Sequence, residues 1–145
     1  MKPPPKTRVL FVCLGNACRS QMAEGFARAY GTDVLIPASA GLSPALMLPS
    51  DTVRAMDEKN IDVRDHFPKG LLQFVHGTKG PQFDLIINMS GFDLPPDIST
   101  PVRHWDVPDP IGVAYETHCH IRDEIERLVM DLILELRRAG RSAAR

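Results

Sequence analysis

The chain has 145 residues, a formal net charge of −1 and a hydrophobic fraction of 43%, which are ordinary values for one soluble domain with its own core. A net charge near zero gives no general attraction to nucleic acid or to an anionic membrane, and no apolar run is long enough to span a bilayer. The proline-rich N-terminus lacks the apolar segment of an export signal, and three cysteines fit a reducing compartment better than a disulfide framework. We therefore expect a cytoplasmic protein that binds neither nucleic acid nor membrane.

Strand and helix patterns alternate along the chain. Strands are predicted at 7–13, 34–41, 84–89 and 102–105, helices at 19–30, 50–59 and 117–138, and a short helix or turn at 71–75. This alternation predicts an α/β fold, a three-layer sandwich in which helices flank a small parallel four-stranded sheet. We expect a single domain over residues 7–138, with flexible tails at 1–6 and 139–145.

A loop between the first predicted strand and the first predicted helix has the composition of an oxyanion site. Cys13 ends the apolar strand, and Arg19 begins the helix with five residues between them, a C-x5-R spacing. Backbone N–H groups that curl around a point, together with a helix N-terminus and a guanidinium fork, bind a tetrahedral anion. The residues expected to line this site are Leu14, Gly15, Asn16, Ala17, Cys18 and Arg19.

The same arrangement should activate Cys13 as a nucleophile. A thiol that faces a helix N-terminus and an arginine favours its thiolate form, and the hydroxyl of Ser20 can donate a hydrogen bond to that thiolate. The loop lacks the second glycine and the Lys-Ser/Thr pair of a nucleotide-binding P-loop. We therefore predict that Cys13 attacks the bound oxyanion.

An attack on an ester also needs an acid that protonates the leaving oxygen. Asp109 is the preferred candidate because it lies between Pro108 and Pro110, which restrict the backbone on either side. Asp106 is the nearby alternative, and aspartates beside prolines are also common in ordinary turns.

Other chemically active residues have weaker patterns. Cys18 could form a disulfide with Cys13 under oxidation or could be a small apolar residue at a helix start, and the sequence leaves both open. The run at 118–120 contains His, Cys and His, but residues two apart do not share a helix face, so a metal site is not expected. The sequence decides neither the role of Cys119 nor whether residues 66–82 form a lid.

The segment 9–20 resembles the active-site loop of the low-molecular-weight protein tyrosine phosphatases. The Ser-Ala-Gly run at 39–41 and the Asp-Pro pair at 109–110 match that family in order and spacing, so the resemblance covers residues 7 to about 138. It implies the low-molecular-weight phosphatase fold and a cysteine-dependent reaction on a phosphate-like group.

Within this superfamily, three segments look like the arsenate reductase branch, namely 21–25, 104–105 and 121–125. Ile111-Gly112 stand where the tyrosine phosphatases usually carry two tyrosines, and the nearest tyrosine is Tyr115. The resemblance therefore favours an arsenate reductase. The alternatives are a phosphatase that hydrolyses phosphomonoesters through a cysteinyl-phosphate and a non-catalytic oxyanion-binding regulatory module.

The resemblance also bears on electron donors. Thioredoxin-coupled arsenate reductases have two further cysteines after the third strand, whereas residues 89–94 of this chain contain none. We expect no resident cofactor and reduction by an external low-molecular-weight thiol, by a redoxin that acts directly, or through Cys18.

Some relatives bind a potassium ion behind the loop. The resemblance places its ligands at Asn16, Glu24, Ser39 and Asp62.

Overall fold

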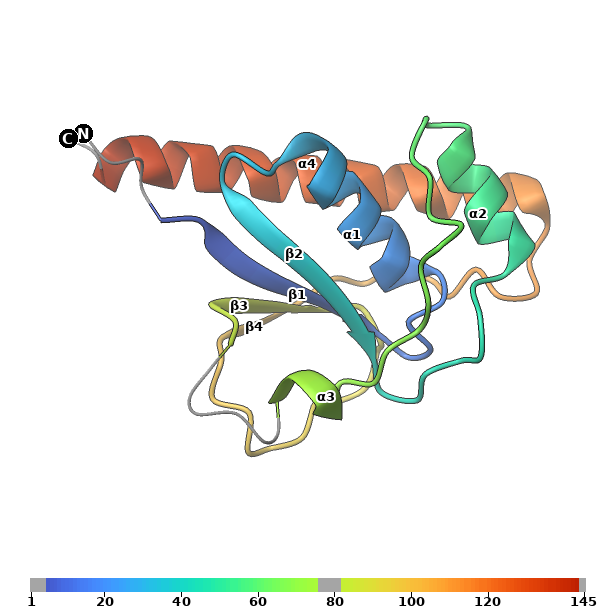
Figure 1. Cartoon of the computed structure of the whole chain (residues 1–145), viewed down its shortest axis with the longest axis horizontal. Coiled ribbons are helices and arrows are strands. Elements are labelled where there is room, and N and C mark those ends of the chain that lie inside the picture. Colours follow the sequence, from blue (N-terminus) through green and yellow to red (C-terminus); the bar gives the residue numbers. More distant parts are fainter. Residues whose placement is uncertain (1–4, 76–81, 144–145) are drawn as a thin grey trace.

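The computed structural model describes residues 5–75 and 82–143, and its sheet has four parallel strands in the order β2-β1-β3-β4 (Figure 1). The elements in chain order are β1 (Thr7–Cys13), α1 (Arg19–Tyr30), β2 (Leu35–Gly41), α2 (Ser50–Asp57), α3 (Leu72–Val75), β3 (Leu85–Asn88), β4 (Val102–His104) and α4 (Tyr115–Ala143). The predicted α/β fold with a parallel sheet flanked by helices is confirmed. Among the described residues, no helix is long and apolar enough to cross a membrane.

Strand β1 is the centre of the sheet, with β2 on one side and β3 on the other. Its residues 9–13 are buried, as expected for a parallel strand that is covered on both faces. Ligands of open parallel sheets bind at the carboxyl ends of such central strands, where neighbouring connections diverge. Strand β1 ends at Cys13, so this cysteine lies at the carboxyl edge of the sheet, where a binding site is expected.

Alternate residues of β1 face two different cores. Helices α1, α2 and α4 lie on one face of the sheet, whereas α3 and the connection from β3 to β4 lie on the other (Figure 1). Phe11 belongs to the larger core with Phe26 and Ile125, and Leu10 belongs to the smaller core with Ile86. The larger core fixes α1, and with it the position of the loop that precedes this helix.

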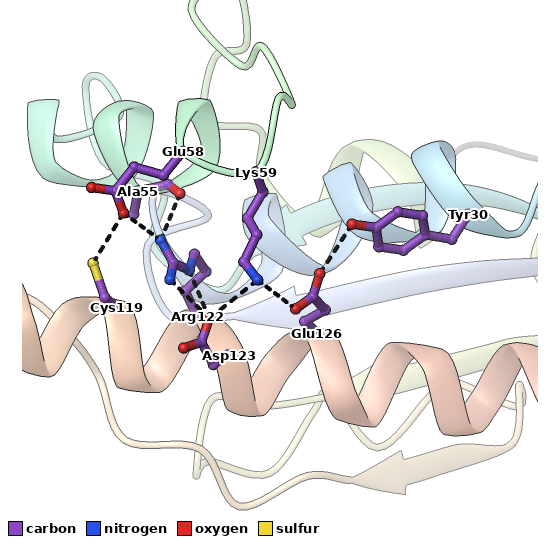
Figure 2. Close-up of polar contacts among 8 residues, drawn as sticks. All are labelled: Tyr30, Ala55, Glu58, Lys59, Cys119, Arg122, Asp123 and Glu126. Atoms are coloured by element: carbon purple, nitrogen blue, oxygen red, sulfur yellow. Dashed lines mark hydrogen bonds and ion pairs between the residues drawn. The ribbon is translucent and has the colours of Figure 1, made fainter.

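Polar contacts tie α4 to the helices beside it (Figure 2). Arg122, which is 7% exposed, donates to Glu58 Oε2 at 2.8 Å. Lys59 donates to Glu126 Oε1 at 3.0 Å, and the Tyr30 hydroxyl donates to Glu126 Oε2 at 3.0 Å. The arginine of the 121–125 motif therefore has a structural role between α2 and α4.

Helix α4 is longer than predicted, and residues 139–143 of the expected C-terminal tail belong to it. Residues 139–143 continue the helix, because no proline interrupts it and Arg137 anchors its last turns. The Arg137 guanidinium donates to both carboxylate oxygens of Asp33, at 2.8 and 3.0 Å, and to the Tyr30 carbonyl at 2.9 Å. Residues 1–4 and 144–145 of the expected tails lie outside the described residues, as do residues 76–81 of the stretch for which a lid was left open.

Helix α2 begins where it was predicted and is shorter than predicted at its C-terminal end. It ends at Asp57, because Asn60 adopts a left-handed conformation (φ 59°) and the N–H of Ile61 then closes back on the Met56 carbonyl at 3.1 Å. Its N-cap is Pro49, so Ser50 is the first helical residue.

Gly41, at the end of β2, packs directly under the Cys13–Arg19 loop. An added Cβ would lie 2.7 Å from the Asn16 nitrogen and 2.8 Å from the Leu14 oxygen, both of them backbone atoms. We predict that Gly41→Ala lowers the free energy of unfolding by about 1–3 kcal/mol, the usual cost of overpacking, as measured by urea denaturation.

Gly70 provides the matched control, because it pairs with Gly41 but its added Cβ would meet only an ordinary contact at 3.7 Å. Equal losses in Gly41→Ala and Gly70→Ala would contradict the close packing of the loop on Gly41.

Candidate active site

The C-x5-R loop is held from outside by the segment that follows β2. The N–H groups of Leu42, Ser43 and Ala45 donate to the carbonyls of Cys13, Leu14 and Gly15 at 3.1, 2.8 and 2.9 Å, respectively. These bonds direct three loop carbonyls away from the hollow between Cys13 and Arg19, which leaves the amide side of the loop for an anion.

Arg19 is fixed by the backbone of two distant segments. Its Nη1 donates to the Met89 carbonyl at 2.6 Å and to the Val107 carbonyl at 3.1 Å, and its side chain is 7% exposed. Its Nη2 lies 3.6 Å from Asp109 Oδ2. One nitrogen of the fork is therefore used as an anchor, and another faces the hollow.

The two candidate acids line different cavities. Asp109 borders the hollow next to Cys13 and Arg19, whereas Asp106 borders a separate cavity of about 170 Å³ on the other side of Arg19. The hollow has a volume of about 10 Å³, room for roughly one water, and Asp109 and Ile111 are among the residues that line it. The geometry therefore brings Asp109 to the predicted nucleophile and does not bring Asp106 there.

A relay of side chains orients the Ser20 hydroxyl toward Cys13. Ser20 Oγ lies 2.9 Å from Cys13 Sγ and accepts a hydrogen bond from Asn16 Nδ2 at 2.7 Å. The amide orientation of Asn16 is set by its Oδ1, which accepts from Gln21 Nε2 at 3.1 Å and from the Lys69 backbone N–H at 2.8 Å. Because Ser20 accepts from Asn16, its own proton is free to point at the sulfur, where it stabilises a thiolate.

Three residues of this hydrogen-bond network were not predicted from the sequence. His66 Nδ1 donates to Gln21 Oε1 at 3.0 Å, and the Lys69 ammonium reaches Asn16 Oδ1 at 3.4 Å. Burial lowers the pKa of Lys69. Gln21 follows Arg19-Ser20 directly and could have been included, whereas His66 and Lys69 come from a stretch without a periodic pattern.

The surroundings of Cys18 do not favour its thiolate form. It is 3% exposed, accepts a hydrogen bond from Thr52 Oγ1 at 3.2 Å, and burial raises its pKa to about 11. Thr52 Oγ1 also lies 3.3 Å from Nε2 of the buried His118. Cys13, Cys18 and Cys119 are all free thiols, and the disulfide between Cys13 and Cys18 stays a prediction.

The residues proposed as potassium ligands make hydrogen bonds and ion pairs with other side chains. Glu24 Oε1 accepts from the Ser39 hydroxyl at 2.7 Å, and Glu24 Oε2 pairs with Arg28 at 3.2 Å. Asn16 Oδ1 already has several donors. The oxygens that would bind a cation are therefore engaged by hydrogen-bond donors.

Asp62, the fourth residue proposed for potassium, is paired with a nearby arginine. Both of its carboxylate oxygens accept from Arg64, at 3.0 and 2.8 Å, and these bonds hold the pKa of Asp62 at about 2. The potassium site stays a prediction, and its Asp62 carboxylate is engaged by an arginine in this structure. Among residues 5–75 and 82–143, no group of three His, Cys, Asp or Glu side chains is placed to hold a metal ion.

Comparison with known proteins agrees with this geometry. Residues 8–94 match the family described as low molecular weight phosphotyrosine protein phosphatase. The chain belongs to this family. The glutaredoxin arsenate reductase of Synechocystis sp. (strain ATCC 27184 / PCC 6803 / Kazusa) is 31% identical over 133 residues, which cover 89% of this chain and 98% of that relative.

Solved structures of this family superpose over nearly the whole chain. An arsenate reductase in the phosphate binding state is 30% identical, has a TM-score of 0.79, and is matched over 90% of this chain and 98% of its own. The YwlE arginine phosphatase from Geobacillus stearothermophilus has a TM-score of 0.79 over 94% of this chain and 96% of its own at 23% identity, so that likeness concerns the fold alone. The protein is thus a cysteine-based enzyme of the low molecular weight phosphatase family, and the alternative of a non-catalytic module is not supported.

We predict that Ser20→Ala slows alkylation of Cys13 by iodoacetamide at neutral pH by roughly tenfold, because a hydrogen bond to a charged sulfur contributes about 1.5–3 kcal/mol. The measurement uses a Cys119→Ser background, which removes the most exposed of the three thiols.

Ser43→Ala is the control, since Ser43 is an exposed serine beside the loop that contributes only its backbone N–H. Equal alkylation rates in the Ser20 and Ser43 variants would show that the hydroxyl of Ser20 does not act on the sulfur.

Proposed function

We propose that this protein is an arsenate reductase that obtains its electrons from an external thiol. The observation that carries the proposal is the hollow in which the Cys13 sulfur, hydrogen-bonded to Ser20, lies beside the anchored fork of Arg19. Amide groups and a guanidinium around a sulfur suit a tetrahedral oxyanion such as arsenate. The curated relative described above is named a glutaredoxin arsenate reductase, which supports arsenate as the substrate.

Binding of the oxyanion requires a movement of the segment around Asp109. The hollow has room for roughly one water, and Asp109 Oδ2 forms an ion pair with Nη2 of Arg19 at 3.6 Å. An arriving oxyanion displaces Asp109 from Arg19 and accepts the hydrogen bonds of the fork instead. The displaced carboxyl then lies next to the oxygens of the substrate, where proton transfer is needed.

The chemistry begins with an attack of the Cys13 thiolate on arsenic. A sulfur–arsenic bond forms, and one oxygen leaves as water after it receives a proton from Asp109. An external thiolate then attacks the Cys13 sulfur, and the electron pair of the sulfur–arsenic bond stays on arsenic, which leaves as arsenite. Cys13 remains in a disulfide with the donor, and a second thiol releases it.

The structure around the remaining thiols supports an external donor. The turn after β3 has no cysteine and is closed by hydrogen bonds from the N–H and hydroxyl of Ser90 to Asn88 Oδ1, at 2.9 and 2.7 Å. Cys18 is buried with a raised pKa, and Cys119 lies on α4 beside Glu58. A low-molecular-weight thiol or a redoxin of the cytoplasm therefore fits better than an internal relay.

A phosphatase activity is the second candidate, and the position of Asp109 favours it. A carboxyl beside the sulfur can activate water to hydrolyse a cysteinyl-phosphate as well as it can protonate a leaving group. Selection for phosphotyrosine has less support, because Ile111 lines the hollow while the Tyr115 ring packs against Arg54 at 3.8 Å.

We predict that Cys13→Ser reduces turnover of arsenate and of an aryl phosphate to the background rate while phosphate binding is retained, because the hydroxyl is a far weaker nucleophile. Cys119→Ser is the control and should keep both activities.

The paired assay measures catalytic efficiency toward an aryl phosphate and toward arsenate with a panel of thiol donors. Arsenate reduction that needs no added thiol, or near-normal turnover by the Cys13 variant, would contradict the mechanism.

Asp109→Asn should slow the hydrolysis of an alkyl phosphate by roughly 10²–10⁴-fold, the usual contribution of a positioned acid, and that of a nitrophenyl phosphate much less. Asp106→Asn, which changes the aspartate of the neighbouring cavity, should affect both esters little. Equal losses for the two esters in the Asp109 variant would show that this carboxyl is not the acid.

A further inference from the structure

Lys69 brings a positive charge to the back of the oxyanion loop. Its backbone N–H donates to Asn16 Oδ1 at 2.8 Å, and its ammonium reaches the same oxygen at 3.4 Å and the Phe67 carbonyl at 3.2 Å. Glu24 is close enough to act on this ammonium electrostatically, against the effect of burial. The cation of the side chain therefore lies near two of the groups that the family resemblance assigned to potassium.

Lys69 also occupies an oxygen atom that a bound potassium ion would need. An alkali ion is held by oxygen atoms with free lone pairs, and Asn16 Oδ1 is already used by Lys69 and Gln21. The carboxylate of Glu24 is shared between Ser39 and Arg28. A charge that is part of the chain thus takes the place of a bound ion.

We propose that the Lys69 ammonium is a built-in substitute for potassium, which fixes the Asn16 side chain so that Ser20 points its hydroxyl at Cys13. The inference extends the proposed function, because it concerns the same loop. A tethered cation is always present, so oxyanion binding by this enzyme does not depend on alkali ions.

Lys69 is better placed for this role than the other cation beside Glu24. Arg28 donates to Glu24 Oε2 and to the Pro37 carbonyl, both at 3.2 Å, and it is more than half exposed. Lys69 alone of the two contacts Asn16, which leads through Ser20 to the sulfur. Lys69 is therefore the residue that positions Asn16, while Arg28 forms an ion pair with Oε2 of Glu24.

The test is binding of inorganic phosphate, measured by calorimetry in potassium chloride and in choline chloride at equal ionic strength. The wild-type protein should bind equally in both salts. Lys69→Met should bind about fivefold more weakly or worse in choline chloride, a usual size for coupling between sites. Potassium should partly restore its binding, because removal of the ammonium leaves the Glu24 carboxylate without the lysine cation that now acts on it.

Lys59→Met is the matched control, because Lys59 is also a half-buried lysine but pairs with Glu126 between α2 and α4. It should bind phosphate like the wild type in both salts, and Lys69→Arg, which keeps a cation, should bind more tightly than Lys69→Met in choline chloride.

Stronger phosphate binding by the wild type in potassium chloride would overturn the proposal, as would unchanged binding by Lys69→Met in choline chloride. If Lys69→Met does not fold, the comparison of the two salts with the wild type still decides. Arsenate reduction is not measured in this test, so a failure of the proposed function would not be confused with a failure of this inference.

Discussion

The loop depends on the side chain of Asn16 more than on any other single group. Asn16 is fully buried and has a positive φ of 50°, a conformation that asparagine tolerates better than most residues. Its oxygen accepts hydrogen bonds from Gln21 and Lys69, and its nitrogen donates to Ser20. The strained turn, the start of α1 and the segment beside β2 are therefore tied together at one amide, and the orientation of that amide decides where the Ser20 proton points.

Arg19 ties the site to the rest of the sheet in a similar way. The carbonyls that hold its Nη1 belong to Met89 and Val107, which are 70 and 88 residues away in the chain. They are brought together because β1, β3 and β4 are parallel and end at one edge, so that the connections after them converge. The fork is thus oriented before a substrate arrives, which spares the ordering cost of a long side chain on binding.

The three thiols of the chain lie in different environments, and these differences bear on which of them can react. Cys13 lies at the end of β1 next to a hydroxyl donor, Cys18 is buried with a pKa of about 11, and Cys119 lies on α4 beside Glu58. Thiol–disulfide exchange requires a thiolate. Burial disfavours the thiolate of Cys18, so this thiol is poorly suited to attack the Cys13 sulfur. The proposed regeneration of Cys13 by an external thiol agrees with all three environments.

The sequence alone determined the central parts of the fold and the site, because they are local. A buried strand, a short loop and a helix follow one another over residues 7–30, so Cys13, Ser20 and Arg19 could be placed from spacing alone. The position of Asp109 beside Cys13, with Asp106 at a separate cavity, and the contact of Lys69 with Asn16 came only from the tertiary structure. These features depend on irregular segments whose residues contact the loop although they lie 50 or more positions away in the sequence. A pattern of hydrophobic residues does not indicate which side chain of such a segment reaches a given atom.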